Sequence, residues 1–402
     1  METAWHEGGE EGCRRHLETT RDKWKDVPLN VAVIGNSGVG KSCFINAIRG
    51  LTADDEGGAS VGVMETTNEV VSYQHPDNPL CLFWDLPGVG TDHFPRESYL
   101  SKIEVDRYDF FLLITADRIT ENDTWLGNEF RKRNKKYLFV RTKIAHDISD
   151  NKKAHPKTHN EEAMIENIHR STEDHLRENG FADVPVFLID NYEPNKFQFE
   201  KLKQQLVADF PDLKRSALIF SLHSTSKQMI KHKVDELRSN IWEWALSWTL
   251  ASTALPAAAA VGTSPVLQLA GIDPDLLIIV DVSDFYFKQL GLDSESLKRT
   301  AKLYSVDYEK IQSIVIKELG IQRVDAVTDE IMEPLVKSIL ARSLPLAAET
   351  AVEKTVKKFS PLIGSLFAAP MSFRRMYRAL NSVLDMLEEV ALAVIKCAAD
   401  SA

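Results

Sequence analysis

The chain has 402 residues, of which 44% are hydrophobic and 27% are charged, and its formal net charge is −11 at pH 7. This length allows two globular domains, and the composition is ordinary for a folded protein. An acidic chain is not suited to coating nucleic acid, so we expect no nucleic-acid partner. The four cysteines form no CxxC pair, which favours a reducing compartment without a disulfide or zinc framework. The polar N-terminus lacks an apolar signal stretch and a second-position glycine, so we expect neither secretion nor N-myristoylation.

The first 28 residues are mostly polar. Leu17 and Trp24 lie seven residues apart within the stretch 14–25, a spacing that places both on one side of a helix. We therefore expect residues 1–28 to form an N-terminal helical segment that packs on the helical half of the chain.

From residue 29 to residue 212, short apolar β-rich runs alternate with polar helical stretches. This alternation is typical of a sheet with crossover helices. Several of the runs are apolar on both faces, as strands covered by helices on both sides must be. The predicted strands are residues 30–34, 69–73, 80–84, 109–115, 137–141 and 184–189. Residues 29–212 are therefore expected to form an α/β domain.

The strand signals fade after Phe210, and apolar residues then recur at helical spacing. One such stripe comprises Phe373, Met376, Tyr377, Leu380, Val383, Leu384 and Leu387. We expect residues 213–402 to form an all-helical domain. The uncharged stretch 245–272 is long enough to cross a bilayer, but its prolines and its many alanines favour a buried helix, a turn and a second helix.

A phosphate-binding motif occupies residues 35–42, which match GxxxxGK[ST] and lie between the first predicted strand and a helical run that begins at Cys43. In this context the backbone N–H groups are expected to surround nucleotide phosphates. Lys41 would bridge the β- and γ-phosphates, and the Ser42 hydroxyl would bind Mg²⁺. The expected nucleotide-binding residues of this loop are Gly35, Asn36, Ser37, Gly38, Val39, Gly40, Lys41, Ser42 and Cys43.

A DxxG motif, Asp85 to Gly88, closes the strand 80–84. Asp85 would hold Mg²⁺ through water, and the Gly88 N–H would contact the γ-phosphate. Residue 89 is valine, so the glutamine that orients water in Ras-like enzymes is missing. In the polar loop before the second strand, Thr67 would complete the Mg²⁺ shell and Glu65 would position water. A solvated loop carboxylate is the alternative interpretation of Glu65.

The base-recognition motif departs from the [NT]KxD pattern of GTPases. Thr142, Lys143 and Ile144 are followed by Ala145, so the aspartate that accepts two hydrogen bonds from guanine is missing. This loss should cost about 3 kcal/mol, or about a hundredfold in affinity. Either Asp147 substitutes through a different loop path or it only caps the loop. Asp190 and Asn191 follow strand 184–189, where GTPases present a short loop to the guanine, with Asn191 as the candidate contact, and an ordinary turn is the alternative.

Several segments resemble the interferon-inducible immunity-related GTPases. They are GNSGVGKSCFINAIRGL, FWDLPGVG, YDFFLLITADRI, KYLFVRTKI, RENGFADVPVFLIDN and, in the helical half, GIDPDLLIIVDVSDFYFKQLGLDSESLKRTAKLYSVD. The resemblance covers nearly the whole chain. It implies a Ras-like GTP-binding domain between an N-terminal helix and a helical C-terminal domain, GTP-dependent assembly through the nucleotide faces, and action on vacuoles of intracellular pathogens. It also places Lys41 and Ser42 on the phosphate loop, Thr67 on the switch threonine and Glu65 on the switch glutamate.

Two basic stretches bear on membrane contact. Five of the six residues 131–136 are basic, and cations at a helix C-terminus complement the helix dipole and stay solvated. The apolar run 359–373 is flanked by lysines and arginines, so it would lie on an anionic bilayer or form a hairpin of the helical bundle. Without a myristoylation signal, we expect membrane contact to be peripheral and to depend on assembly.

The leading hypothesis is a cytoplasmic, dynamin-like GTPase with bound Mg²⁺ that contacts endomembranes or vacuoles. It would hydrolyse GTP slowly alone and faster when two nucleotide domains of this protein or of related GTPases meet. The alternative is a nucleotide-dependent regulator of related GTPases with little or no turnover. A P-loop ATPase is the third hypothesis, because the usual guanine-reading aspartate is absent.

Overall fold

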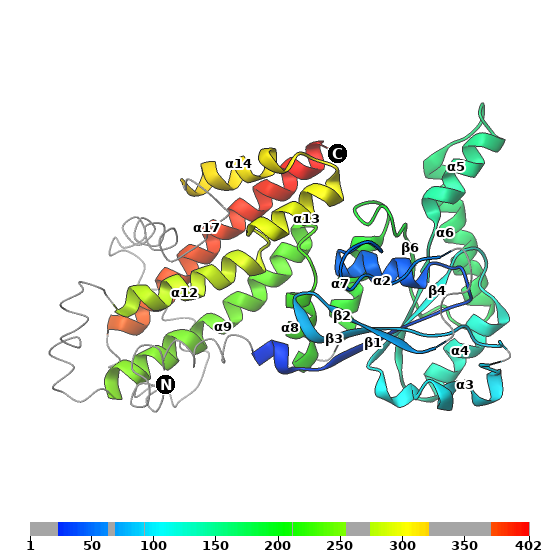
Figure 1. Ribbon diagram of the computed structural model, residues 1–402, viewed down its shortest axis with the longest axis horizontal. Coiled ribbons are helices and arrows are strands. Elements are labelled where there is room, and N and C mark those ends of the chain that lie inside the picture. Colours follow the sequence, from blue (N-terminus) through cyan, green and yellow to red (C-terminus); the bar gives the residue numbers. More distant parts are fainter. Residues whose placement is uncertain are drawn as a thin grey trace. The chain divides into compact units, whose positions relative to one another are not determined.

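The computed structural model describes residues 23–62, 69–91, 93–210, 212–254, 274–320 and 371–401 (Figure 1). The chain divides into two compact units, one of Trp24–His223 and one of Ser224–Ala402 with Met1–Lys23. The first unit contains the sheet and the second is helical in its described part. Of the predicted N-terminal helix, residues 1–22 lie outside the described residues.

The first unit is built on a six-stranded sheet in the order β2-β3-β1-β4-β5-β6. All neighbouring pairs are parallel except β2 and β3, which are antiparallel. The strands are β1 (Leu29–Ile34), β2 (Val71–His75), β3 (Asn78–Asp85), β4 (Phe110–Thr115), β5 (Lys136–Arg141) and β6 (Val186–Leu188). All six predicted strands are confirmed, with ends shifted by no more than two residues. The predicted α/β fold class is confirmed as well.

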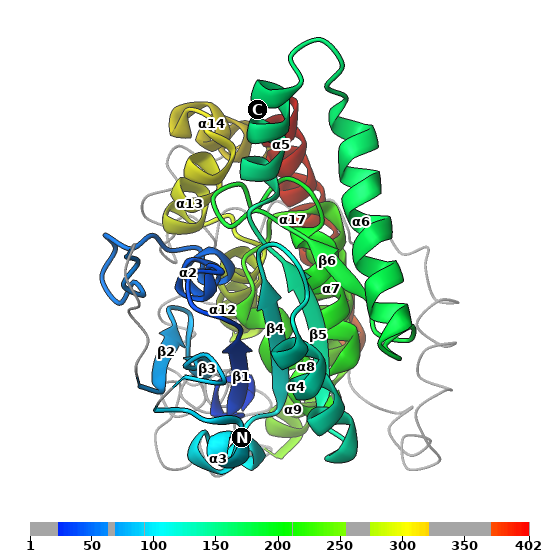
Figure 2. The ribbon, with the colours of Figure 1, turned by 90° about the vertical axis from the view of Figure 1, so that its right-hand side faces the viewer.

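Helices cover both faces of the sheet (Figure 2). They are α2 (Lys41–Arg49), α3 (Arg96–Lys102), α4 (Glu121–Lys132), α5 (Ile144–Ala154), α6 (Glu161–Glu178), α7 (Phe199–Asp209) and α8 (Asp212–Ser221), with short 3-10 turns η1 (Lys23–Asp26) and η2 (Val105–Arg107). Successive side chains of a strand point to opposite faces. Phe111 accordingly stacks on Phe130 of α4 at 4.1 Å, whereas Phe110 stacks on Phe210, after α7, at 5.4 Å. The strand β4 is therefore buried on both faces, as its continuous apolar run predicts.

The hairpin of α5 and α6 extends past the carboxyl ends of the strands (Figures 1 and 2). A small apolar cluster supports it, in which Ile144 and Ile148 of α5 contact Leu188 of β6 and half-buried residues of α6. Because α5 begins three residues after β5 ends, the hairpin starts at the base-recognition motif. The base-recognition motif therefore lies between strand β5 and helix α5, and the small apolar cluster holds α5 in place.

The helix α8 belongs to the sheet unit and not to the helical unit. Its Phe220 packs against Trp24, with 5.4 Å between ring centroids, and its Ser221 Oγ accepts a hydrogen bond from Asn78 Nδ2 at 3.0 Å. Lys214 Nζ lies 2.7 Å from Asp109 Oδ1. The division of the chain therefore falls at residue 224, beyond the predicted boundary at 213, because the apolar side of α8 is buried in this unit.

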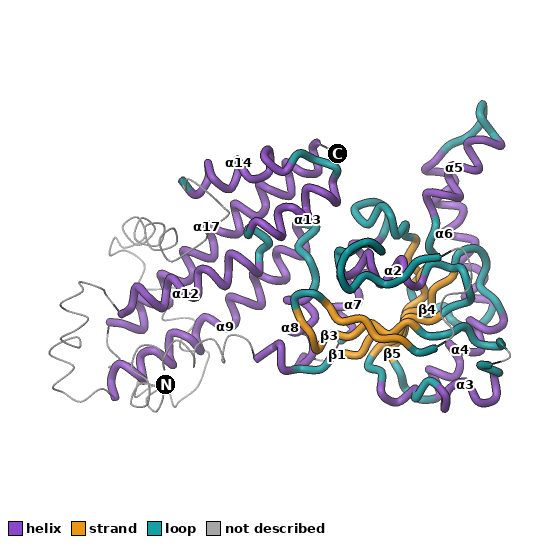
Figure 3. The backbone as a smooth tube through the Cα atoms, viewed as in Figure 1, coloured by secondary structure: helices purple, strands orange, loops and turns teal. Residues whose placement is uncertain are grey.

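The described part of the second unit contains α9 (Lys227–Ala254), α12 (Pro274–Gln289), α13 (Ser294–Tyr304), α14 (Tyr308–Leu319) and α17 (Met371–Ser401). The long helix α17 packs along α9, α12 and α14 (Figure 3). From the predicted apolar stripe of α17, Met376, Leu380, Val383, Leu384 and Leu387 are buried. The helical prediction is confirmed for these residues.

Two stretches with a proposed relation to membranes fall partly outside the described residues. The helix α9 covers the first part of the uncharged stretch 245–272, up to Ala254. From the basic and apolar stretch 357–378, the structure describes residues 371–378, as the start of α17. Among the helices that the structure describes, none has the length and hydropathy needed to cross a membrane.

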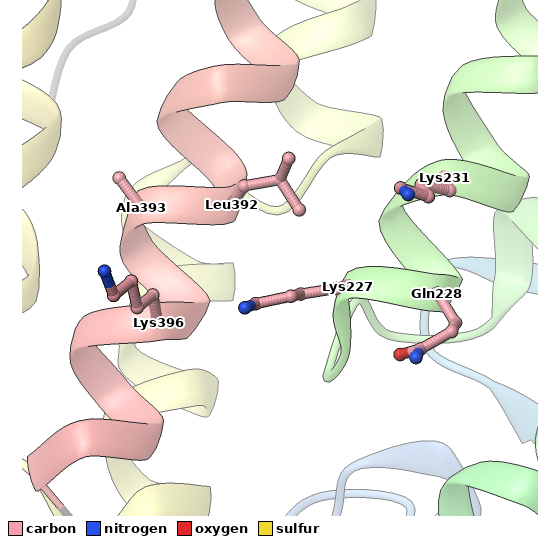
Figure 4. Close-up of a pocket in the computed structure, with 6 residues that line it drawn as sticks. All are labelled: Lys227, Gln228, Lys231, Leu392, Ala393 and Lys396. Carbon is pink, nitrogen blue, oxygen red and sulfur yellow. The ribbon is translucent and has the colours of Figure 1, made fainter.

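A pocket of about 390 Å³ lies between the start of α9 and the end of α17 (Figure 4). Its lining includes Lys227, Lys231 and Lys396 together with Gln228, Leu392 and Ala393. Within the described ranges, none of the three lysines forms an ion pair. The pocket is therefore locally cationic, on a chain whose formal net charge is −11.

We expect the sheet unit to need α8 for its stability. A polypeptide of residues 24–223 should unfold cooperatively, whereas residues 24–211 should lose at least about 3 kcal/mol of unfolding free energy, because burial of each large apolar side chain contributes roughly 1.5–3 kcal/mol. Urea denaturation followed by circular dichroism measures the difference. Equal midpoints and slopes for the two polypeptides would contradict the placement of α8 in this unit.

Candidate functional site

The loop from Gly35 to Ser42 connects β1 to α2 and leaves its backbone donors open. The helix α2 starts at Lys41 after Gly40, which has a φ of 94° and supplies no side-chain cap. The first N–H groups of α2 are therefore free to bind an anion. A Cβ on Gly35 would lie 2.1 Å from the Ile114 carbonyl oxygen, so only glycine fits there. A Cβ on Gly38 would meet nothing within 4 Å, so the loop borders open space at that point.

The side chains of Lys41, Ser42 and Asp85 meet at this loop. Lys41 is buried, and its Nζ donates a hydrogen bond to the Asn36 carbonyl oxygen at 3.2 Å. Ser42 Oγ donates to Asp85 Oδ2 at 2.6 Å. The two elements come together because Val33 of β1 is paired with Asp85 in the parallel register. A hydroxyl and a carboxylate are oxygen donors of the type that Mg²⁺ prefers, so this pair of side chains fits the ion.

The DLPG segment lies directly against the phosphate loop. A Cβ on Gly88 would be 3.5 Å from the Gly35 carbonyl oxygen. The Tyr99 hydroxyl donates to the Pro87 carbonyl oxygen at 2.6 Å, and burial raises the pKa of Tyr99 well above its ordinary value. A phenol that stays protonated is a permanent donor, so it fixes the segment. The Val89 side chain packs in the buried core cluster and carries no polar group that could orient a water molecule.

The base-side motifs are hydrogen-bonded to the phosphate loop. Thr142 Oγ1 donates to the Val39 carbonyl oxygen at 2.6 Å, and Asn191 Nδ2 donates to the Gly40 carbonyl oxygen at 3.0 Å. Lys143, the residue after Thr142, has a φ of 63°, a backbone conformation that costs energy for a residue other than glycine and often occurs at functional sites. The structure thus brings Thr142 and Asn191 together with the phosphate loop.

Asp147 lies one turn into α5 and pairs with Arg141. Its Oδ2 is 3.0 Å from the Arg141 guanidinium, and both side chains are mostly buried. The sequence left open whether this carboxylate replaces the missing guanine reader or caps the loop. In the structure it is engaged by a cation at the end of β5.

The remaining predicted residues, Glu65 and Thr67, lie outside the described residues. The loop that leads to them is anchored by a reciprocal pair of hydrogen bonds. Asn46 Nδ2 donates to the Ala59 carbonyl oxygen at 2.8 Å, and the Ala59 N–H donates to Asn46 Oδ1 at 2.6 Å. The chain therefore enters the segment of Glu65 and Thr67 from a fixed point beside α2.

Tyr192 is a surface residue of this site that the sequence reasoning missed. It is 80% exposed, and its hydroxyl lies 3.5 Å from the Cys43 sulfur at the start of α2. The sequence offers no signal for it, because its position depends on a turn after β6 that lies far from Cys43 along the chain. An exposed aromatic side chain next to the phosphate loop is a candidate contact for a partner.

The chain is similar over nearly its whole length to a family of known proteins. The family model described as Interferon-inducible GTPase (IIGP) matches residues 2–397. Interferon-gamma-inducible GTPase 10 of Mus musculus is 32% identical over 372 residues, which cover 92% of this chain and 81% of that protein. Interferon-inducible GTPase 5 of Rattus norvegicus is 31% identical over 377 residues, covering 94% and 75%. The crystal structure of Era with MgGDPNP and a 16S ribosomal RNA segment aligns with 17% identity over 46% of this chain and 57% of Era, at a TM-score of 0.32. Because the family match spans nearly the whole sequence, the chain belongs to the interferon-inducible GTPase family.

Proposed function

We propose that this protein binds GTP with Mg²⁺ and hydrolyses it to GDP in cell-autonomous immunity, at intracellular membranes. The observation that carries the proposal is the hydrogen bond of 2.6 Å between Ser42 Oγ, at the end of the phosphate loop, and Asp85 Oδ2. This contact joins the two motifs that GTPases use to hold the metal ion and to sense the γ-phosphate. Family membership supports the same activity.

The proposed mechanism assigns one task to each part of the loop. The open N–H groups at the start of α2 bind the phosphate oxygens, and Lys41 moves from the Asn36 carbonyl oxygen to the β- and γ-phosphates. Ser42 and Asp85 would hold the metal ion, and Thr67 would be a further ligand. Magnesium, when bound, would neutralise negative charge on the phosphate groups. The Gly88 N–H contacts the γ-phosphate.

We propose Glu65 as the residue that positions the attacking water. Position 89, where Ras-like enzymes carry a glutamine, holds a valine whose side chain is buried in the core. The nucleophile must therefore be oriented from elsewhere in the site. Along the chain, Glu65 and Thr67 follow Ala59, which is hydrogen-bonded to Asn46 of α2.

Assembly through the nucleotide face is part of the proposal. Tyr192 is 80% exposed beside Cys43, and tyrosine is enriched among the residues that dominate interface energies. A second copy or a related GTPase that covers this face would exclude water from the phosphate loop. We propose that membrane contact is peripheral and that it gains strength from the same assembly.

A nucleotide-dependent regulator with little turnover is the second candidate function. The observation that favours it is the loss of two polar side chains. Val89 lies in the core where Ras-like enzymes carry a glutamine, and Ala145 occupies the position of the aspartate in the base motif. Such a protein would bind related GTPases in a nucleotide-dependent way without hydrolysing GTP itself.

Replacing Lys41 tests nucleotide binding. We expect Lys41→Ala to weaken GTP binding about a hundredfold, because it removes charge-assisted hydrogen bonds to two phosphates. Titration with a fluorescent GTP analogue in the presence of Mg²⁺ measures the affinity. Lys132→Ala is the matched control, since Lys132 pairs with Glu129 on the surface of α4. The same dissociation constant for both variants would contradict the site.

Turnover distinguishes the two candidate functions. We expect GTP hydrolysis per molecule to rise with protein concentration as nucleotide faces meet, and Glu65→Ala to lower it about a hundredfold with unchanged GTP affinity. Phosphate release measures the rate, with the exposed Glu69 replaced by alanine as control. Absence of hydrolysis at high protein concentration with Mg²⁺ would refute the GTPase and leave the regulator.

A further inference from the structure

The loops after β5 and β6 lie side by side at the base end of the site. The strands are parallel neighbours, with Arg141 paired to Leu188. Ala145 follows the first strand and occupies the position of the missing aspartate, while Asp190 follows the second. The Ala145 N–H donates to Asp190 Oδ2 at 3.2 Å. A carboxylate therefore lies next to the position that lacks one, although it comes from the other loop.

Asp190 is buried and incompletely paired. The residue is 5% exposed. Its second carboxylate oxygen, Oδ1, accepts a hydrogen bond from the Tyr192 N–H at 2.9 Å. In the part of the chain that the structure describes, no cation pairs with this carboxylate. Each carboxylate oxygen accepts up to two hydrogen bonds, and a buried charge is costly unless its acceptors are satisfied. One acceptor position on each oxygen thus remains for a ligand.

We propose that Asp190 replaces the missing aspartate at position 145 as the residue that reads guanine, by accepting hydrogen bonds from the N1–H and the 2-amino group of the base. This inference rests on the proposed function, because it concerns the base of the same nucleotide. A second acceptor supports it. Asn191 Oδ1 is buried without a hydrogen-bond partner among the described residues, while the same side chain holds the Gly40 carbonyl oxygen through its Nδ2.

The other acidic residue near this motif is committed elsewhere. Asp147 Oδ2 is paired with the Arg141 guanidinium at 3.0 Å. To read the base it would have to break this pair and leave a mostly buried guanidinium unpaired, which is unfavourable. Asp190 needs no such exchange, since its present partners are backbone N–H groups that each oxygen can keep.

A purely structural role for Asp190 makes a different prediction from base reading. Its carboxylate accepts an N–H from the first turn of α5, whose N-cap residue, Lys143, supplies no side-chain cap. Asparagine at position 190 keeps an acceptor oxygen for this cap but replaces the second oxygen, which accepts the Tyr192 N–H, by an N–H donor. Loss of that backbone contact would weaken GDP and XDP binding alike, so the ratio of the two affinities in Asp190→Asn separates the two roles.

The experiment measures the affinities of the full chain for GDP, XDP and ADP by competition against a fluorescent GDP analogue. Xanthine carries a carbonyl oxygen where guanine carries its 2-amino group, so an asparagine N–H suits xanthine and opposes guanine. We expect Asp190→Asn to lose about a hundredfold in GDP affinity and to prefer XDP over GDP. The double variant Ala145→Asp/Asp190→Asn should return the preference to GDP, because it restores a carboxylate across the same contact.

Asp147→Asn is the matched control and should keep the preference for GDP. Thermal unfolding of each variant shows whether it is folded. If the wild type prefers GDP and Asp190→Asn does not change the ratio of GDP to XDP affinity, Asp190 is only a cap and the inference is wrong. A reversal in Asp147→Asn instead would equally overturn it. If the wild type binds GDP no better than ADP, the proposed GTP specificity itself fails.

Discussion

The parallel pairing of β1 with β3 is the constraint on which the site depends. It pairs Val33 with Asp85, so the strand that ends in the phosphate loop and the strand that ends in DLPG stop at the same edge of the sheet. Ser42 is then within 2.6 Å of Asp85, and Gly88 lies against Gly35. A slip of one residue would turn every side chain of β3 to the other face. Burial of the apolar residues on both faces of β1 and β3 therefore fixes the register of the two strands. That register in turn sets the position of the contact between Ser42 and Asp85 at the strand ends.

Local sequence patterns predicted most of the sheet unit and the phosphate side of the site. Each strand is a short apolar run bounded by polar residues, and the loop motif lies between a strand and a helix. The boundary at α8 was missed because apolar residues at helical spacing, such as Leu218 and Phe220, suit the core of either unit. Whether they pack on Trp24 or on another helix is decided by contacts that are distant along the chain.

The residues around the base-recognition motif were less predictable, because their contacts also join segments that are distant along the chain. The motif signalled a missing aspartate, but the hydrogen bond between Ala145 and Asp190 joins residues 45 positions apart. No periodicity or spacing reports such a contact, since it depends on the register of β5 with β6. The sequence placed Asp190 in a base-side turn but offered only Asp147 as the substitute for the missing aspartate, and the structure pairs Asp147 with Arg141. Proximity in sequence was therefore a poor guide to which carboxylate borders the base site.

The hydrogen bonds of Thr142 and Asn191 explain how such a motif can change without loss of the site. They hold the carbonyl oxygens of Val39 and Gly40, the last before α2, and a Cβ on Gly40 would lie 2.9 Å from Asn191 Nδ2. The base-side loops therefore support the phosphate loop through residues other than the one that reads the base. Because the scaffold and the reader are separate side chains, position 145 can lose its carboxylate while α2 keeps its place, provided that a neighbouring loop offers another acceptor to the base.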